Sequence, residues 1–205
     1  LHGSSAASDV YKRQQWWCWF STYKMRIIGG NKGRIRINPP KNLKLRPTTD
    51  RCKESLFNII NNDFDLDQCE VLDLFSGTGN ISYEFCSRGA KRVISVESNI
   101  KALNFIKKFS VENGFNIETI RSDVFTYLKK IQSKFDIIFS DPPYNLDKKK
   151  YTEIINQVFK NKYLKKNGIL IIEHSSKIDF KSTHNFNKSK TYGDTTFTFF
   201  QNINN

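Results

Sequence analysis

The sequence has few residues of the kinds that build metal centres, disulfide frameworks or membrane spans. Its three histidines show no ligand spacing, so we expect no metal site. Its four cysteines (Cys18, Cys52, Cys69, Cys86) form no C-x-x-C pair, which argues against a zinc ribbon or a thioredoxin-type motif and indicates free thiols in a reducing compartment. No apolar stretch reaches the ~18 residues that a transmembrane helix needs. We therefore expect a cytoplasmic protein without a membrane partner.

Acidic residues are scarce relative to basic ones. Lys and Arg total 33 against 20 Asp and Glu, which gives 205 residues a formal net charge of +13. Such an excess points toward a polyanionic partner, most often nucleic acid. A merely basic enzyme is an equal alternative on charge alone. The length predicts one domain more readily than two. A hydrophobic content of 38% argues against intrinsic disorder.

Residues 1–24 differ from the rest of the chain. They hold all three tryptophans and stand directly before the only methionine, Met25. Their apolar run, Trp16 to Phe20, is shorter than the roughly seven to fifteen residues of a signal peptide. We expect residues 1–24 to be a non-native or disordered extension, with translation starting at Met25; an aromatic anchor is the alternative.

A basic appendage follows over residues 25–62. Alternation in Arg34-Ile35-Arg36-Ile37 predicts a short strand with its two arginines on one face. Pro39-Pro40 ends this strand. After a basic loop, Thr49 or Asp50 can cap a helix over about residues 51–61.

Strands and helices alternate within residues 63–205, which we expect to form the main domain. The strands are near-continuously apolar and the segments between them have helical patterns, which predicts an α/β fold with a parallel, doubly wound sheet. The expected strands are 71–75, 92–97, 117–121, 135–140 and 169–173, with 191–200 as a closing hairpin element. The expected helices are 80–88, 100–113, 124–132 and 151–159.

Acidic residues stand at the ends of three successive strands, where open α/β sheets bind ligands. Asp73 precedes the turn Ser76-Gly77-Thr78-Gly79, which is neither a full G-x-G-x-x-G nor a Walker A loop. Asp73 would repel phosphate but suits a cationic amino group. Glu97 can accept both hydroxyls of a ribose, and Asp123, beside Val124, can accept from an exocyclic amine or cap the next helix. Together they predict a nucleoside cofactor without phosphate.

The fourth strand ends in Asp141-Pro142-Pro143-Tyr144. Two prolines fix the loop's φ angles and remove two N–H donors, which leaves carbonyls and a carboxylate as acceptors. Acceptors followed by an aromatic ring suit a planar amine that stacks on Tyr144. A rigid turn without a ligand is the alternative.

These motifs resemble those of known enzymes. Asp73-x-Phe75-x-Gly77-x-Gly79 is similar to motif I of class I S-adenosylmethionine-dependent methyltransferases, and Asp141 to Tyr144 to the (D/N)PP(Y/F) signature of amino-nitrogen methyltransferases. Residues 25–30, 45–51 and 54–58 closely resemble the RsmD family. The resemblance implies a Rossmann-like, mostly parallel seven-stranded sheet. It also implies methyl transfer from S-adenosylmethionine to the exocyclic N2 of one guanine in 16S ribosomal RNA, with S-adenosylhomocysteine as product.

The resemblance also implies roles for single residues. In the cofactor site, Asp73, Phe75, Gly77, Thr78 and Gly79 would line the methionine end, Glu97 and Ser98 the ribose, and Asp123 and Val124 the adenine. Asp141, Pro142, Pro143 and Tyr144 would be catalytic. The expected RNA contacts are Arg34, Arg36, Lys44, Arg46, Thr48, Thr49, Arg51 and Lys148. We expect a monomer acting on naked 16S RNA or on the assembling small subunit.

Three rival functions remain open. An adenine-N6 DNA methyltransferase has the same tetrapeptide but generally carries a sizeable target-recognition domain, and only 46 residues precede Pro47. A non-catalytic RNA-binding assembly factor would not need intact motifs. A protein-glutamine methyltransferase would favour Asn at position 141, which is Asp here.

Overall fold

The computed structural model describes residues 25–40, 43, 48–143 and 145–202. The expectations for residues 1–24, Lys44, Arg46 and Tyr144 fall outside these residues. Within the described part of the chain, no helix is both long and apolar enough to cross a bilayer.

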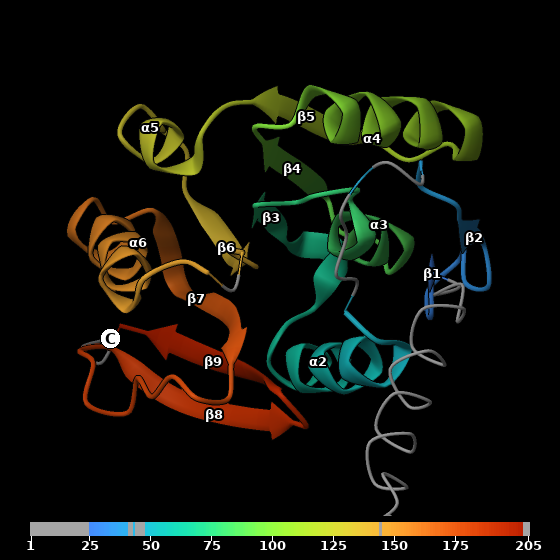
Figure 1. Ribbon diagram of the computed structural model, residues 1–205. Helices are drawn as coiled ribbons and strands as arrows, with labels where there is room; N and C mark the ends of the chain where they lie inside the picture. Colours follow the sequence, from blue (N-terminus) through green and yellow to red (C-terminus); the bar gives the residue numbers. More distant parts are fainter. Residues whose placement is uncertain (1–24, 41–42, 44–47, 144, 203–205) are drawn as a thin grey trace, which may run out of the picture.

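The centre of the fold is a seven-stranded sheet in the order β5-β4-β3-β6-β7-β9-β8 (Figure 1). Its first five strands are parallel, and β9 runs antiparallel to both β7 and β8. The predicted doubly wound, mostly parallel sheet is therefore confirmed. The strands are β3 (Glu70–Leu74), β4 (Arg92–Glu97), β5 (Ile117–Arg121), β6 (Phe135–Ser140), β7 (Leu164–Ser175), β8 (Phe186–Tyr192) and β9 (Thr195–Gln201).

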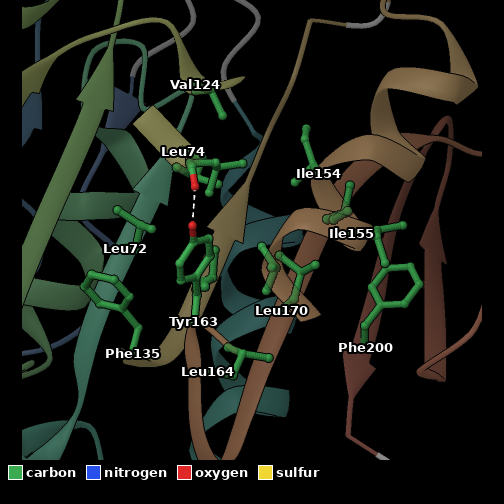
Figure 2. Close-up of a cluster of buried hydrophobic side chains, with 14 of the residues drawn as sticks. Leu72, Leu74, Val124, Phe135, Ile154, Ile155, Tyr163, Leu164, Leu170 and Phe200 are labelled. Carbon is green, nitrogen blue, oxygen red and sulfur yellow. Dashed lines mark hydrogen bonds between the residues drawn. The ribbon is translucent and has the colours of Figure 1, made fainter. Parts of the chain in front are cut away.

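Helices cover both faces of the sheet (Figure 1). They are α2 (Asp50–Asp63), α3 (Asn80–Ser87), α4 (Ile100–Asn113), α5 (Val124–Leu128) and α6 (Lys148–Lys160), with a 3-10 turn η1 (Leu66–Gln68). Leu72 and Leu74 of β3 pack with Ile154 and Ile155 of α6 (Figure 2). On the opposite face, the strands pack against Leu56, Phe57 and Ile60 of α2. Burial on both faces explains why the strands read as continuous apolar runs.

Several boundaries differ from the sequence prediction. Helix α6 begins at Lys148 because Asp147 caps it, its carboxylate accepting the Lys149 amide at 3.1 Å. Helix α5 is shorter than predicted and ends at Leu128. Strand β7 begins earlier, at Leu164, which pairs with Phe135 of β6. The closing element is two strands, β8 and β9, with Gly193 between them at φ +59°.

The N-terminal appendage is a small hairpin of β1 (Met25–Arg26) and β2 (Arg36–Ile37). As predicted, Arg36 is exposed and Ile37 is buried. The strand is shorter than predicted, because Arg34, although exposed, lies in the preceding turn with φ +75°. The hairpin does not stand apart, because Ile27 and Ile37 share a core with Ile106 of α4.

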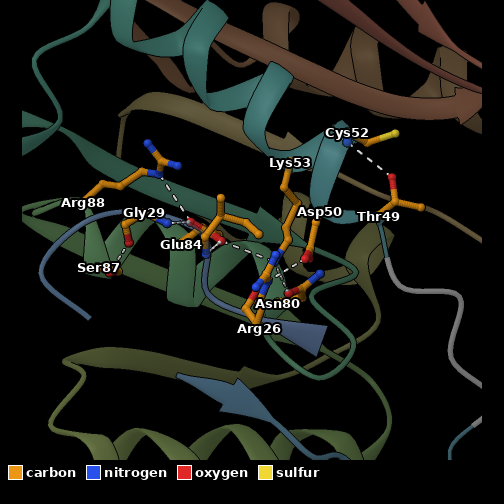
Figure 3. Close-up of polar contacts among 11 residues, drawn as sticks. Arg26, Gly29, Thr49, Asp50, Cys52, Lys53, Asn80, Glu84, Ser87 and Arg88 are labelled. Carbon is orange, nitrogen blue, oxygen red and sulfur yellow. Dashed lines mark hydrogen bonds and ion pairs between the residues drawn. The ribbon is translucent and has the colours of Figure 1, made fainter. Parts of the chain in front are cut away.

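A buried ion pair that the sequence analysis did not predict ties this hairpin to α2 and α3 (Figure 3). The Lys53 ammonium donates to the Arg26 carbonyl, to Asn80 Oδ1 at 3.0 Å and to Glu84 Oε1 at 3.3 Å. Glu84 also accepts the Ile28 amide and the Gly29 amide. Burial lowers the pKa of Lys53, against the opposing effect of Glu84. The network therefore fixes the hairpin beside the start of α3.

We expect Lys53→Met to lower the free energy of unfolding by about 3–5 kcal/mol, the usual effect of removing one partner of a buried ion pair. The side chains of both Lys53 and Glu84 are at most 1% exposed. In the variant, Glu84 would lose one of its two charge partners in a dry site and keep only Arg88, at 3.3 Å. Urea unfolding measures the change. The double variant Lys53→Met/Glu84→Gln should regain part of the loss; no recovery would contradict the assignment of the effect to the buried carboxylate that has lost its Lys53 partner.

Candidate active site

The predicted catalytic and cofactor motifs meet where β3 and β6 end. Leu74 of β3 pairs with Ser140 of β6, so Phe75 and Asp141 leave the sheet side by side. The Asp141 amide donates to the Leu74 carbonyl at 3.3 Å. Here lies a small cleft with a cavity volume of about 60 Å³. It is lined by Met25, Thr48, Asp73, Phe75, Ser76, Gly77, Thr78, Asn80, Ile81, Phe139 and Asp141.

The turn after β3 holds residues in left-handed conformations, with Phe75 at φ +59°, Gly77 at +54° and Gly79 at +83°. The two glycines serve different purposes. A Cβ on Gly79 would lie 2.9 Å from the Tyr83 ring, so the packing of Tyr83 leaves no room for a side chain at this position. A Cβ on Gly77 would meet nothing closer than the Phe75 carbonyl at 4.0 Å. Gly77 therefore leaves the backbone open to a ligand, as a cofactor-binding turn requires.

Asp73 is a buried carboxyl group at the base of the cleft, 1% exposed. Its Oδ2 accepts the hydroxyl of Ser82, whose oxygen lies 2.6 Å from that of Ser95. Burial raises the pKa of Asp73 to about 7, although the hydrogen bonds from Ser82 oppose the shift. A cation bound beside Asp73 would favour its ionised form.

Glu97, at the end of β4, joins two loops of the site. Its Oε2 accepts the Gly77 amide at 2.9 Å, and its Oε1 accepts the Asn99 amide at 2.7 Å and the Ser98 hydroxyl at 3.3 Å. A carboxylate has about four acceptor positions, and these three bonds leave one of them for a ribose hydroxyl. The predicted ribose residues are thus placed directly beside the glycine turn.

Asp123 and Val124 stand at the start of α5. Asp123 caps this helix, accepting the Thr126 amide at 2.9 Å, which confirms the capping interpretation. The Val124 side chain is buried in the core with Leu74, so only its backbone can face a ligand. Neither residue lines the cleft, and nor do Glu97 and Ser98. Their contacts with adenine and ribose stay predictions.

The loop after β6 carries the motif that is predicted to be catalytic. Asp141 is half-buried and Pro142 is buried, whereas Pro143 is exposed. The Pro143 carbonyl accepts the Leu146 amide at 2.8 Å, which closes a turn. One of the two lone pairs of the Pro143 carbonyl therefore holds the loop in shape.

The predicted RNA contacts divide into two groups. Arg34, Arg36, Arg51 and Lys148 are exposed. Thr48 and Thr49 instead form hydrogen bonds with other residues of the protein. Thr49 caps α2 by accepting the Cys52 amide at 3.3 Å, whereas Thr48 donates its hydroxyl to Glu173 Oε2 at 2.9 Å. The pair of Thr48 and Glu173 was not predicted, because 125 residues separate its members and no local pattern signals it.

The sheet order, the glycine turn after β3 and the Asp-Pro-Pro loop after β6 together define a class I methyltransferase fold. Residues 25–201 match the family described as "Conserved hypothetical protein 95". The chain belongs to this family, the one identified above as RsmD.

Individual proteins agree with this assignment. The chain is 33% identical to the "Ribosomal RNA small subunit methyltransferase D" of Buchnera aphidicola subsp. Baizongia pistaciae, over 88% of this chain and 93% of the relative. A candidate methylase from Haemophilus influenzae has a similar crystal structure, with a TM-score of 0.70, 28% identity and coverage of 88% and 99% of the two chains. The 16S rRNA N2 methyltransferase RsmC of Thermus thermophilus, solved with AdoMet and guanosine, shares the fold at a TM-score of 0.62, with 18% identity and coverage of 77% and 44%.

Proposed function

We propose that this protein transfers a methyl group from S-adenosylmethionine to the exocyclic N2 of a guanine in 16S ribosomal RNA. The observation that carries the proposal is the cleft in which Asp73 and Gly77 of the cofactor motif lie with Asp141 of the amino-nitrogen motif. The curated relative named above as an rRNA small subunit methyltransferase supports the choice of RNA.

The residues present fit this cofactor. Asp73 would hold the ammonium of its methionine part, the open backbone at Gly77 would lie against it, and Glu97 would bind the ribose. Asp123 and the Val124 backbone would flank the adenine. When bound, S-adenosylmethionine supplies a methyl group already activated by the sulfonium charge.

Guanine N2 is a poor nucleophile because its lone pair is delocalised into the ring. The Asp141 carboxylate and the Pro142 carbonyl would accept hydrogen bonds from its two N–H groups, localise the lone pair and stabilise the positive charge that develops on nitrogen. The nitrogen–methyl bond would form as the sulfur–methyl bond breaks, which leaves S-adenosylhomocysteine, and the surplus proton on nitrogen would pass to the Asp141 carboxylate. Tyr144 would stack on the flipped base. The turn at Pro143 would keep these groups in position, and in-line positioning supplies much of the rate.

Exposed basic residues would hold the RNA backbone. Arg34, Arg36, Arg51 and Lys148, with Lys44 and Arg46 beside them in the sequence, would contact phosphates. The Thr49 hydroxyl already accepts the Cys52 amide as the cap of α2, so a contact of this side chain with RNA would have to share that hydroxyl. On this proposal the protein acts as a cytoplasmic monomer, on naked RNA or on the assembling subunit.

Arg36→Ala/Arg51→Ala should weaken RNA binding and lower the slope of log K against log salt by about 2, close to one for each phosphate that the variant no longer neutralises. Titrations at several salt concentrations measure this slope. The matched control is Lys166→Ala/Lys190→Ala, which removes two exposed charges from β7 and β8. Equal slopes in both double variants would contradict the assignment.

Labelled methyl transfer to small subunits, naked 16S RNA and DNA tests the function itself, with mapping of the modified base. We expect label on guanine N2 of the RNA. Label on DNA adenine would favour the DNA methyltransferase. Label on protein glutamine would favour the third rival. No transfer to any substrate would favour an assembly factor.

A further inference from the structure

A buried carboxylate, Glu173, stands beside the catalytic loop and has no part in the mechanism above. Ser140 of β6 pairs with Ile172 of β7, so Glu173 occupies the next position, level with Asp141. It is 4% exposed. Because side chains alternate along a strand, Glu173 lies on the same face as Ile171, the face that also carries Phe139 of the cleft.

Glu173 determines how the Thr48 hydroxyl is oriented. A threonine hydroxyl has one hydrogen to donate and two lone pairs to accept with. Thr48 donates its hydrogen to Glu173 Oε2 at 2.9 Å. Thr48 also lines the cleft together with Asp73 and Asp141. Its hydroxyl can therefore offer the cleft only lone pairs.

We propose that Thr48 is a specificity-determining residue that accepts the N1–H of the target guanine, and that Glu173 is the positioning residue that keeps Thr48 an acceptor. This inference rests on the proposed function and names the feature of the base that is selected. Guanine carries N1–H directly beside its N2 amino group, so two neighbouring donors face the same side. Adenine has no hydrogen on the N1 beside its amino group. Its N1 and the Thr48 hydroxyl oxygen would both be acceptors and could not form a hydrogen bond, so adenine would be disfavoured.

The test compares target RNA with guanine and target RNA with 2-aminopurine at the modified position. 2-Aminopurine keeps the amino group but lacks N1–H. The wild-type protein should prefer guanine in kcat/KM, and Thr48→Val, of nearly equal shape, should reduce that preference about tenfold. Thr48→Ser keeps the hydroxyl and should restore it. A merely structural role for Thr48 would change both substrates equally.

Glu173→Gln is the second variant. Its amide can donate to Thr48 and release the threonine hydrogen toward the cleft, so the preference for guanine should fall while S-adenosylhomocysteine binding stays unchanged. An unaltered preference in both Thr48→Val and Glu173→Gln would overturn the inference. Weaker S-adenosylhomocysteine binding by Thr48→Val would also overturn it, since Thr48 would then belong to the cofactor. If wild-type protein methylates no guanine in RNA, the proposed function itself fails.

Discussion

Asp141→Ala is expected to lower kcat for RNA methylation about a hundredfold or more, the usual effect of removing a group that stabilises developing charge. Asp141 lines the cleft at the end of β6 and is the only carboxylate of the Asp-Pro-Pro-Tyr motif. Single-turnover methyl transfer with saturating cofactor measures the chemical step. Calorimetric binding of S-adenosylhomocysteine should change little, because the cofactor contacts that we propose come from the ends of β3, β4 and β5 and not from the loop after β6.

Asp141→Asn is the matched control for this prediction. It keeps one oxygen acceptor of the same size but removes the negative charge. We expect its activity to lie between those of the wild-type protein and Asp141→Ala. Near-wild-type turnover in Asp141→Ala would remove Asp141 from the mechanism. Equal loss in both variants would assign the whole effect to the charge.

Asp73→Asn is expected to weaken cofactor binding about tenfold to a hundredfold, because a charge-assisted hydrogen bond to the cofactor's ammonium becomes a neutral one. Calorimetry with S-adenosylhomocysteine, which carries the same ammonium group, measures the dissociation constant. In the wild-type protein the affinity should also fall as pH drops below the Asp73 pKa of about 7, since protonation removes the charge. An unchanged dissociation constant would exclude Asp73 from the cofactor site.

The same variant should be more stable than the wild-type protein at neutral pH. Burial raises the pKa of Asp73 from 3.8 to about 7, so the folded state holds this proton more tightly than the unfolded state. The resulting stability is fully present below pH 3.8 and is lost as pH rises through about 7. Asparagine does not titrate and can still accept from Ser82. The stability difference, measured by urea unfolding, should therefore grow between pH 4 and pH 8; a constant difference would contradict the buried carboxyl's role.

The sequence alone located those elements whose ends carry local signals. Helix α4 spans Ile100–Asn113 as predicted, because Asn99 caps its first turn and Gly114 ends it in a left-handed conformation at φ +64°. Strands β4, β5 and β6 also have the predicted bounds. Helix α5 was predicted too long, since its apolar pattern continues past the residue where the helix ends.

The positions of the motif residues could also be predicted from the sequence, because strand ends and glycine turns are local features. The sequence by itself determined the parallel sheet, the glycine turn and the placement of Asp73, Glu97 and Asp141 at strand ends. Only the tertiary structure decided which groups meet. Lys53 joins Glu84 across 31 residues and Thr48 joins Glu173 across 125. Such pairs, and the raised pKa of Asp73, depend on how completely the assembled layers exclude water, which no segment of the chain specifies by itself.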